Sequence, residues 1–172
     1  AQVHAGQTVL VHAAAGGVGS LAVQLAKWKG ARVVATTSAA NAGLVESLGA
    51  DEVIDYRSGP FQDRVDGIDL VFDTLGGEVQ DDSWSVLAPG GMLVSVVAAP
   101  SVDRALQAGV EAKFVFIQPS AMILRELAGL VDRGIVRPIV GAEFALADAA
   151  KAQALSESGR ARGKIVLHVG QP

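Results

Sequence analysis

Short apolar segments rich in β-branched residues recur along the first two-thirds of the chain, a pattern typical of buried parallel strands. They predict strands at residues 8–11, 31–37, 52–56, 69–73, 92–97 and 113–117. Helices are predicted between them, from Val18 onward and over residues 41–48, 78–87 and 102–108. Strands that alternate with helices predict an α/β fold with a doubly wound parallel sheet, whose usual strand order is 3-2-1-4-5-6.

The last third of the chain has a different pattern. It predicts a helix over residues 121–132, an extended segment over 137–144, a helix over 146–158 and a final strand over 163–169. Two interpretations of this tail are open. It either adds strands to the same domain or forms a piece of a second one.

A glycine-rich turn follows the first predicted strand directly. If Ala14 replaces the first glycine of a G-x-G-x-x-G motif, with φ kept negative, Gly16 and Gly19 occupy the second and third positions. Gly16 lets a pyrophosphate approach the backbone, and Gly19 lets the helix pack tightly on the strand. A glycine turn in another kind of α/β protein is the alternative, but the flanking strand and helix favour a dinucleotide site. The predicted pyrophosphate contacts are Ala15, Gly16, Gly17 and Val18.

The end of the second predicted strand bears on which cofactor binds. NAD enzymes usually place an Asp or Glu there for the ribose 2′-hydroxyl. This chain has Thr36, Thr37 and Ser38 instead, and no acidic residue before Glu46. Hydroxyls without a carboxylate leave room for a 2′-phosphate, so the pattern favours NADP over NAD, with Thr37 and Ser38 as candidate contacts. An ordinary Ser/Thr loop is the alternative interpretation.

Charge and composition narrow the possible partners. The 172-residue chain has a net charge of −4 and no block of Lys or Arg, so we expect neither nucleic acid nor an anionic membrane as a partner. It contains no Cys, which excludes disulfides and thiolate zinc sites within it. His4, His12 and His168 lie far apart in the sequence, and we interpret them as structural histidines, so no metal ligand is predicted.

The sequence was also searched for membrane-spanning and targeting segments. No apolar run approaches the ~20 residues of a membrane span, and the first residues do not resemble a signal peptide. We therefore expect a cytoplasmic protein that acts on a small molecule.

Five motifs follow one another in order through almost the whole chain, at residues 12–20, 48–56, 72–77, 87–91 and 159–167. Together they resemble the medium-chain dehydrogenase/reductase superfamily, which is zinc-type alcohol dehydrogenase-like. They look most similar to its quinone oxidoreductase-like branch.

This resemblance implies a missing part. Members of the superfamily have two domains, and a GroES-like domain that precedes the nucleotide-binding one supplies most of the substrate cleft. In the resemblance, residues 1–135 correspond to the NAD(P)-binding Rossmann domain. Residues 136–172 correspond to the segment that returns to complete the absent domain. We therefore expect a fragment of a longer protein, with a natural short protein as the alternative.

The resemblance also implies cofactor contacts. In NADP-using relatives the 2′-phosphate is commonly held by a Ser, a Lys and a Tyr. Ser38 and Tyr56 match, but residues 41–43 contain no Lys, and Arg57 is a candidate substitute. Further residues match positions whose backbone lines the ribose and nicotinamide, namely Leu75, Val97, Phe116 and Ile117.

Two functions fit this pattern. The first is an NADPH-dependent oxidoreductase that transfers a hydride to a quinone, an enone or a related carbonyl compound. The second is a nucleotide-binding module or sensor without turnover. No catalytic residue is predicted, because Tyr56 has Pro60 rather than Lys four residues on, and Asp73 is expected to order its own loop.

The sixth predicted strand indicates an assembly. Residues 113–117, from Lys113 to Ile117, would form the outermost strand and carry a continuous apolar run. Such an edge needs a cover. We expect a homodimer through this strand, as the resemblance also implies. The alternative is that the tail near Val140 covers the edge within one chain.

Overall fold

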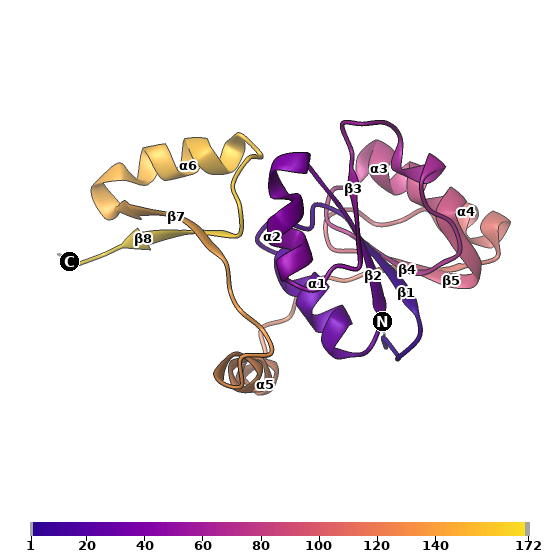
Figure 1. The fold of residues 1–172 in the computed structure, drawn as a ribbon, viewed down its shortest axis with the longest axis horizontal. Helices are drawn as coiled ribbons and strands as arrows, with labels where there is room; N and C mark the ends of the chain where they lie inside the picture. Colours follow the sequence, from indigo (N-terminus) through magenta and orange to yellow (C-terminus); the bar gives the residue numbers. More distant parts are fainter. Residues whose placement is uncertain (1, 171–172) are drawn as a thin grey trace.

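The computed structural model describes residues 2–170. Its centre is a six-stranded parallel sheet of order β3-β2-β1-β4-β5-β6 (Figure 1). The predicted fold class and strand order are confirmed. The strands are β1 (Thr8–Val11), β2 (Arg32–Thr37), β3 (Glu52–Asp55), β4 (Ile68–Asp73), β5 (Leu87–Ser95) and β6 (Glu111–Phe114).

Helices cover both faces of this sheet (Figure 1). Because side chains alternate between the faces of a strand, Val9 and Val11 of β1 pack on one face and Leu10 on the other. Val23 of α1 joins the first cluster and Trp84 the second. Burial on both faces explains why the strands read as continuous apolar runs. The helices are α1 (Gly19–Trp28), α2 (Ala42–Ser47), α3 (Gly77–Asp82) and α4 (Val102–Ala108), with 3₁₀ turns η1 (Ala39–Asn41), η2 (Phe61–Asp63) and η3 (Ser83–Val86).

The boundary between α3 and β5 differs from the prediction. The helix predicted over residues 78–87 ends at Asp82 and continues as the 3₁₀ turn η3, and β5 begins at Leu87 rather than at Met92. The pairing register with β4 shifts between Ile68 and Leu70, so the Pro-Gly-Gly sequence lies in an irregular part of the strand. The turn signal at residues 89–91 therefore marks a bulge rather than a loop.

The sixth strand also differs from the prediction. β6 ends at Phe114 because its partner β5 ends at Ser95, although the Val115 amide still donates to the Ser95 carbonyl oxygen at 2.9 Å. The rest of the predicted strand has no partner within residues 2–170, and Phe116 and Ile117 are 78% and 72% exposed. The prediction of a strand through Ile117 is wrong in this respect.

The C-terminal part forms a separate small sheet. After α5 (Ala121–Asp132), β7 (Val140–Ala145) and β8 (Lys164–His168) pair in parallel, joined by η4 (Leu146–Asp148) and α6 (Ala149–Glu157). In Figure 1, α6, β7 and β8 lie to the left of the large sheet. Since β7 pairs with β8 and not with β6, the interpretation that the tail near Val140 covers the β6 edge is wrong.

Two sets of polar contacts attach the C-terminal part to the sheet. The Gln24 side chain accepts a hydrogen bond from the Arg137 amide at 2.7 Å and donates one to the Arg137 carbonyl at 3.0 Å. The Gly163 amide donates to the Ala15 carbonyl at 2.8 Å, beside a β-bridge between Gly16 and Gly163. The second contact brings the C-terminal part directly onto the glycine turn.

Among residues 2–170, no helix has both the length and the apolar composition that a membrane span requires.

Candidate functional site

The glycine turn connects β1 to α1 with a tight backbone reversal. Ala13 has a φ of 48°, and its carbonyl oxygen accepts a hydrogen bond from the Gly16 amide at 2.9 Å. The strained position is thus Ala13, while Ala14 keeps a negative φ and is buried, as its place in the motif requires. The Ala14 amide donates to the Thr36 carbonyl at 3.0 Å, which fixes the turn to the end of β2.

The third glycine of the motif is required by packing. A Cβ on Gly19 would lie 2.4 Å from the Ala13 carbonyl oxygen and 2.8 Å from the Ala14 Cα. The helix therefore starts in contact with the backbone of the turn, as the motif predicts. Gly17 is close to the C-terminal part of the chain, because a Cβ added to it would lie 2.9 Å from the Gly163 carbonyl oxygen.

A cavity of about 530 Å³ opens beside this turn, at the carboxyl ends of the strands. This is the position at which ligands bind in doubly wound sheets. The structure brings together six of the predicted cofactor contacts along its wall: Ala15, Gly16, Thr37, Ser38, Tyr56 and Leu75. Residues from the ends of four strands that are far apart in the sequence thus meet at one site.

The other predicted contacts lie outside the cavity. Gly17 and Val18 belong to the same turn but do not line it. Val97 lies near the loop after β4, because a Cβ on Gly76 would be 3.4 Å from its Cγ2. Phe116 and Ile117 are exposed beyond β6. All five residues therefore lie along the carboxyl edge of the sheet and do not line the cavity.

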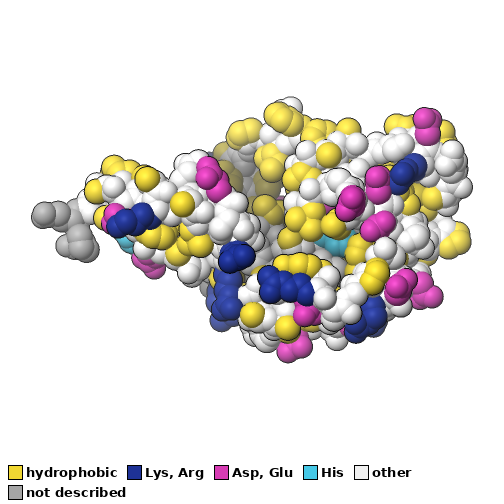
Figure 2. All heavy atoms as spheres, turned by 90° about the horizontal axis from the view of Figure 1, so that it is seen from above, with side chains coloured by type: hydrophobic (Ala, Val, Ile, Leu, Met, Phe, Trp, Pro, Cys, Tyr) yellow, Lys and Arg dark blue, Asp and Glu magenta, His cyan; other side chains and the backbone are white. Residues whose placement is uncertain are grey.

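The cavity also contains residues that sequence reasoning did not assign to it. The loop between α6 and β8 contributes Arg160, Ala161 and Arg162, and an Arg162 Nη donates to the Ala40 carbonyl at 3.0 Å. In Figure 2, Lys and Arg side chains gather where the C-terminal part meets the larger part. Arg160 and Arg162 are evident in the sequence, but no sequence pattern indicates that Arg162 lies next to Ala40, which is 122 positions away.

Asp73 orders its own loop, as predicted. The fully buried carboxylate accepts hydrogen bonds from the Leu75 and Gly76 amides, both at 2.9 Å, and from Gln80 at 2.8 Å. Burial raises the pKa of the carboxyl, but these hydrogen bonds outweigh it and leave the pKa below its ordinary 3.8. Asp73 does not line the cavity, so it is a structural anion rather than a base at the site.

His12 forms part of the cavity wall as a satisfied, neutral side chain. Its Nδ1 lies 3.0 Å from the Thr36 Oγ1 and its Nε2 lies 2.9 Å from the Ser83 Oγ. Burial lowers the pKa of His12 from 6.5 to about 4, although the Asp73 carboxylate acts in the opposite direction. The imidazole therefore carries no charge into the cavity near neutral pH.

Comparison with known proteins assigns the family. A family model described as zinc-binding dehydrogenase matches residues 48–167. The chain belongs to this medium-chain dehydrogenase/reductase family. The family resemblance that the five motifs indicated is thus confirmed.

Individual relatives of this dehydrogenase family agree. The chain is 33% identical to the mitochondrial NAD(P)H oxidoreductase RTN4IP1 of Danio rerio, over 94% of this chain and 49% of that protein. The quinone oxidoreductase structure from Coxiella burnetii is 36% identical with a TM-score of 0.91, over 98% of this chain and 54% of that one. The structure of a mycobacterial protein in complex with NADPH is 32% identical with a TM-score of 0.84, over 97% of this chain and 58% of that one. The chain spans about half the length of these relatives.

The family name implies zinc, and the residues present do not fit a zinc site. Within residues 2–170 there is no group of three or more His, Cys, Asp or Glu side chains that could hold a metal ion. The chain contains no Cys, and His168 lies 2.6 Å from Glu143 in a two-residue contact on the small sheet. We therefore assign no zinc chemistry to the residues that the structure describes.

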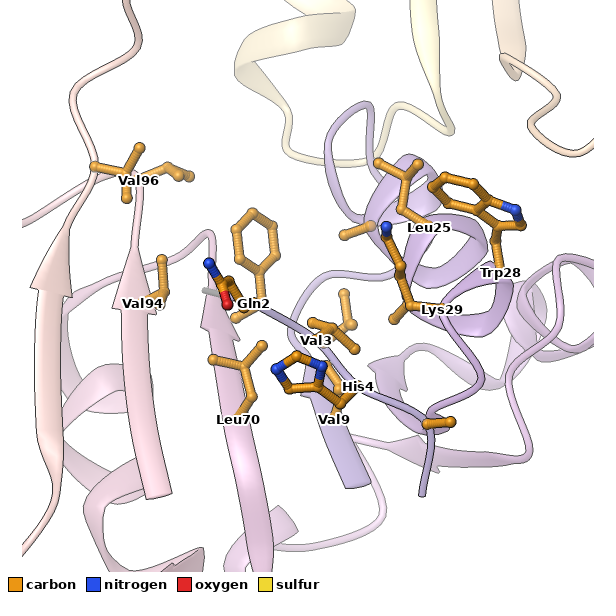
Figure 3. Close-up of a pocket in the computed structure, with 16 residues that line it drawn as sticks. Gln2, Val3, His4, Val9, Leu25, Trp28, Lys29, Leu70, Val94 and Val96 are labelled. Carbon is orange, nitrogen blue, oxygen red and sulfur yellow. The ribbon is translucent and has the colours of Figure 1, made fainter. Parts of the chain in front are cut away.

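A second cavity, of about 850 Å³, lies on the α1 face of the sheet (Figure 3). Its wall is mostly aliphatic, with Val9, Leu25, Leu70 and Val94 pointing into it. For the phosphate charges of a dinucleotide this wall offers few polar side chains, namely Gln2, His4 and Lys29. Although it is the larger of the two, it is a poorer candidate for a dehydrogenase cofactor than the polar cavity at the glycine turn.

Proposed function

We propose that this chain is the cofactor-binding part of an NADPH-dependent oxidoreductase. One observation carries this proposal. The cavity at the glycine turn is lined by Ser38, Tyr56 and three arginines, and by no Asp or Glu within residues 2–170. A ribose 2′-phosphate would find hydrogen-bond donors and positive charge there, whereas the carboxylate typical of NAD sites is not among the lining residues.

The proposed roles of the residues follow from their places in the cavity and along the edge of the sheet beside it. The backbone of Ala15 and Gly16 would hold the pyrophosphate, together with the turn at Gly17 and Val18. Thr37, Ser38 and Tyr56 would contact the adenosine ribose and its phosphate. The nicotinamide would extend toward Leu75 and Val97, with Phe116 and Ile117 beyond them. When bound, the cofactor supplies a hydride, and the protein orients it and excludes water.

The proposed substrate is a quinone, an enone or a related carbonyl compound. The Coxiella burnetii relative is named a quinone oxidoreductase, and an Arabidopsis thaliana relative is named an NADPH-dependent alkenal/one oxidoreductase. We propose residues 1–135 as the NAD(P)-binding domain and residues 136–172 as a segment that completes a second, cleft-forming domain. The proposed location of the protein is the cytoplasm.

A non-catalytic nucleotide-binding module remains the second candidate. The observation that favours it is the state of the two buried titratable groups nearest the cavity. Asp73 is occupied by its own loop, and His12 is hydrogen-bonded and neutral. Neither group is available as an acid or base, so these residues alone supply binding but no proton transfer.

Nucleotide titration tests the proposed function. We expect calorimetry to show that the wild-type chain binds NADPH more tightly than NADH, because only NADPH presents a 2′-phosphate. Gly16→Val should abolish binding of both cofactors, since the side chain would occupy the space beside the turn. Equal affinities for the two cofactors, or tighter binding of NADH, would refute the 2′-phosphate assignment.

Gly129→Val is the matched control for this titration. Gly129 lies in α5, and its nearest neighbour is the Arg133 guanidinium, 3.5 Å from where a Cβ would be. This variant should bind NADPH like the wild type. Thermal unfolding of both variants separates a lost binding site from a lost fold, because a Cβ on Gly16 would lie 3.1 Å from the Ala13 carbonyl.

We also propose a homodimer through the edge of the large sheet. β6 is the outermost strand, and the apolar Phe116 and Ile117 extend the edge into solvent. An uncovered edge of this kind offers unpaired backbone groups to a second copy, with the same patch used twice. The exposed run after β6 adds apolar surface to such a contact.

Sedimentation equilibrium tests the dimer. We expect twice the 17.6 kDa chain mass for the wild type. Phe116→Glu should give the monomer mass, because it places charge in the contact. A wild-type chain that is monomeric at micromolar concentration would contradict this proposal.

A further inference from the structure

His12 lies where several parts of the cavity wall meet. It follows β1 directly, it is buried, and it lines the cavity at the glycine turn. Its Nδ1 faces Thr36 near the end of β2, and its Nε2 faces Ser83 in η3. The ring of Phe61 in η2 packs edge-on against the imidazole, with the ring centres 4.8 Å apart. A single side chain thus joins segments that lie 24 and 71 positions further along the sequence.

The backbone of His12 is held as well as its side chain. The His12 amide donates to the Phe72 carbonyl at 3.2 Å, and the His12 carbonyl accepts from the Thr74 hydroxyl at 3.0 Å. Phe72 belongs to β4, and Thr74 directly follows that strand. Because both the backbone and the ring are bonded, the imidazole has one fixed place between β2 and η3.

The partners of His12 determine which of its nitrogens carries the hydrogen. The Ser83 hydroxyl donates to the Val79 carbonyl at 2.6 Å, and a carbonyl can only accept, so the single hydroxyl hydrogen of Ser83 is used there. The Ser83 oxygen therefore accepts from Nε2 of His12, at 2.9 Å. Burial lowers the pKa of His12 to about 4, so the ring is neutral at pH 7. Its Nδ1 is then bare and accepts from the Thr36 hydroxyl at 3.0 Å.

These contacts form one continuous hydrogen-bond network. We define the His12 network as the Thr36 hydroxyl, the His12 imidazole, the Ser83 hydroxyl and the Val79 carbonyl. Every hydrogen in it points the same way, from β2 toward α3. Hydrogen bonds arranged in this way polarise and strengthen one another. Thr36 and Val79, at the two ends, line the cavity, whereas Ser83 is fully buried and lies outside its wall.

We propose that His12 is a positioning residue for the nicotinamide cofactor. It holds the end of β2, with the proposed contacts Thr37 and Ser38, in a fixed place relative to the α3 wall at Val79. This inference rests on the proposed function, because it concerns the cavity in which the cofactor is proposed to bind. A cavity whose walls are already in place loses less free energy to ordering when a ligand binds. No group in the His12 network is charged, so its effect should be equal for NADPH and NADH.

Ser83→Ala tests this inference most sharply. Since Ser83 lies outside the cavity wall, its hydroxyl can affect a bound cofactor only through the His12 network. We expect calorimetry to show that NADPH and NADH both bind about fivefold more weakly, close to the effect of one hydrogen bond. Ser85→Ala is the matched control, because Ser85 lies in the same turn and donates to the Asp82 carbonyl at 2.7 Å, but is exposed. This control should leave both affinities unchanged.

His12→Phe and His12→Gln separate the packing of the ring from its hydrogen bonds. Phenylalanine keeps an aromatic ring next to Phe61 but leaves the buried Thr36 hydroxyl without its acceptor. We expect this variant to bind both cofactors about tenfold more weakly. Glutamine keeps one donor and one acceptor, so it should recover part of that loss. In the double variant His12→Phe/Ser83→Ala the two losses should not add, because both changes remove the same link. Thermal unfolding of each variant checks that it is folded at the titration temperature.

The imidazole ¹⁵N shifts of the wild-type chain test the direction of the His12 network. They should show a protonated Nε2 and a bare Nδ1, and the opposite tautomer would overturn the inference. Unchanged affinities in Ser83→Ala would overturn it too, even if His12→Phe binds weakly, because His12 would then act only through its own place in the wall. A loss for NADPH alone would also contradict it. A wild-type chain that binds neither cofactor would refute the proposed function, and the inference with it.

Discussion

Gly19→Ala should lower the free energy of unfolding by about 3 kcal/mol, near the upper end of overpacking effects. The added Cβ would lie 2.4 Å from the Ala13 carbonyl oxygen and 2.8 Å from the Ala14 Cα. Both neighbours are backbone atoms, and Ala13 already has a strained φ of 48°. The turn cannot move away easily, because the Ala14 amide is bonded to the end of β2. Urea unfolding followed by circular dichroism measures this change.

Gly43→Ala is the control for this substitution. Gly43 lies in α2, and a Cβ there would have no neighbour within 4 Å. Alanine should therefore raise the stability by about 0.5–1 kcal/mol, because it lowers the entropy of the unfolded chain and favours the helix. If both variants changed the stability by the same small amount, the contact between α1 and the turn would not be as close as the structure has it.

The second large effect is a loss of stability in mild acid, caused by His12. The folded chain holds this imidazole neutral with a pKa of about 4, whereas the unfolded chain protonates it at 6.5. Between these values the unfolded state binds more protons, so stability falls as the pH falls. The difference corresponds to about 3 kcal/mol lost between pH 6.5 and pH 4.

His12→Gln should remove this pH dependence. Glutamine offers one donor and one acceptor to Thr36 and Ser83 but does not titrate. Urea unfolding at a series of pH values gives the slope for each protein. The buried Asp73 carboxylate does not confuse the comparison, because its pKa is lowered and its stabilisation is lost only below pH 3.8. A wild type and variant with equal slopes between pH 6.5 and 4 would show that His12 is not the cause.

Local sequence rules predicted the parts of the fold that depend on neighbouring residues. The turn between β1 and α1 follows from glycine spacing, and the order of the sheet follows from alternating strands and helices. The loop function of Asp73 follows from its place at a strand end. The turn and the Asp73 loop are decided within about ten residues of sequence, where propensity and periodicity are informative, whereas the sheet order follows from the regular succession of strands and helices along the chain.

The features that were missed depend on partners elsewhere in the chain. β5 begins at Leu87 because Ile68 of β4 is available to pair with it, despite a sequence that reads as a turn. β6 stops at Phe114 because β5 offers no further partner, despite an apolar run that continues. Arg162 reaches the cavity only because the loop before β8 docks on the glycine turn. Pairing of distant segments decides all three, and a single sequence does not show it.

The central claim is that the polar cavity at the glycine turn, and not the larger apolar one, binds the nicotinamide cofactor. Chemical-shift mapping of the ¹⁵N-labelled chain with NADPH tests this most directly. The account predicts shifts for the amides of Gly16, Gly17, Ser38 and Tyr56. It predicts no shifts for Trp28 and Leu70, which line the apolar cavity. Shifts confined to the apolar cavity, or no shifts at saturating NADPH, would contradict it.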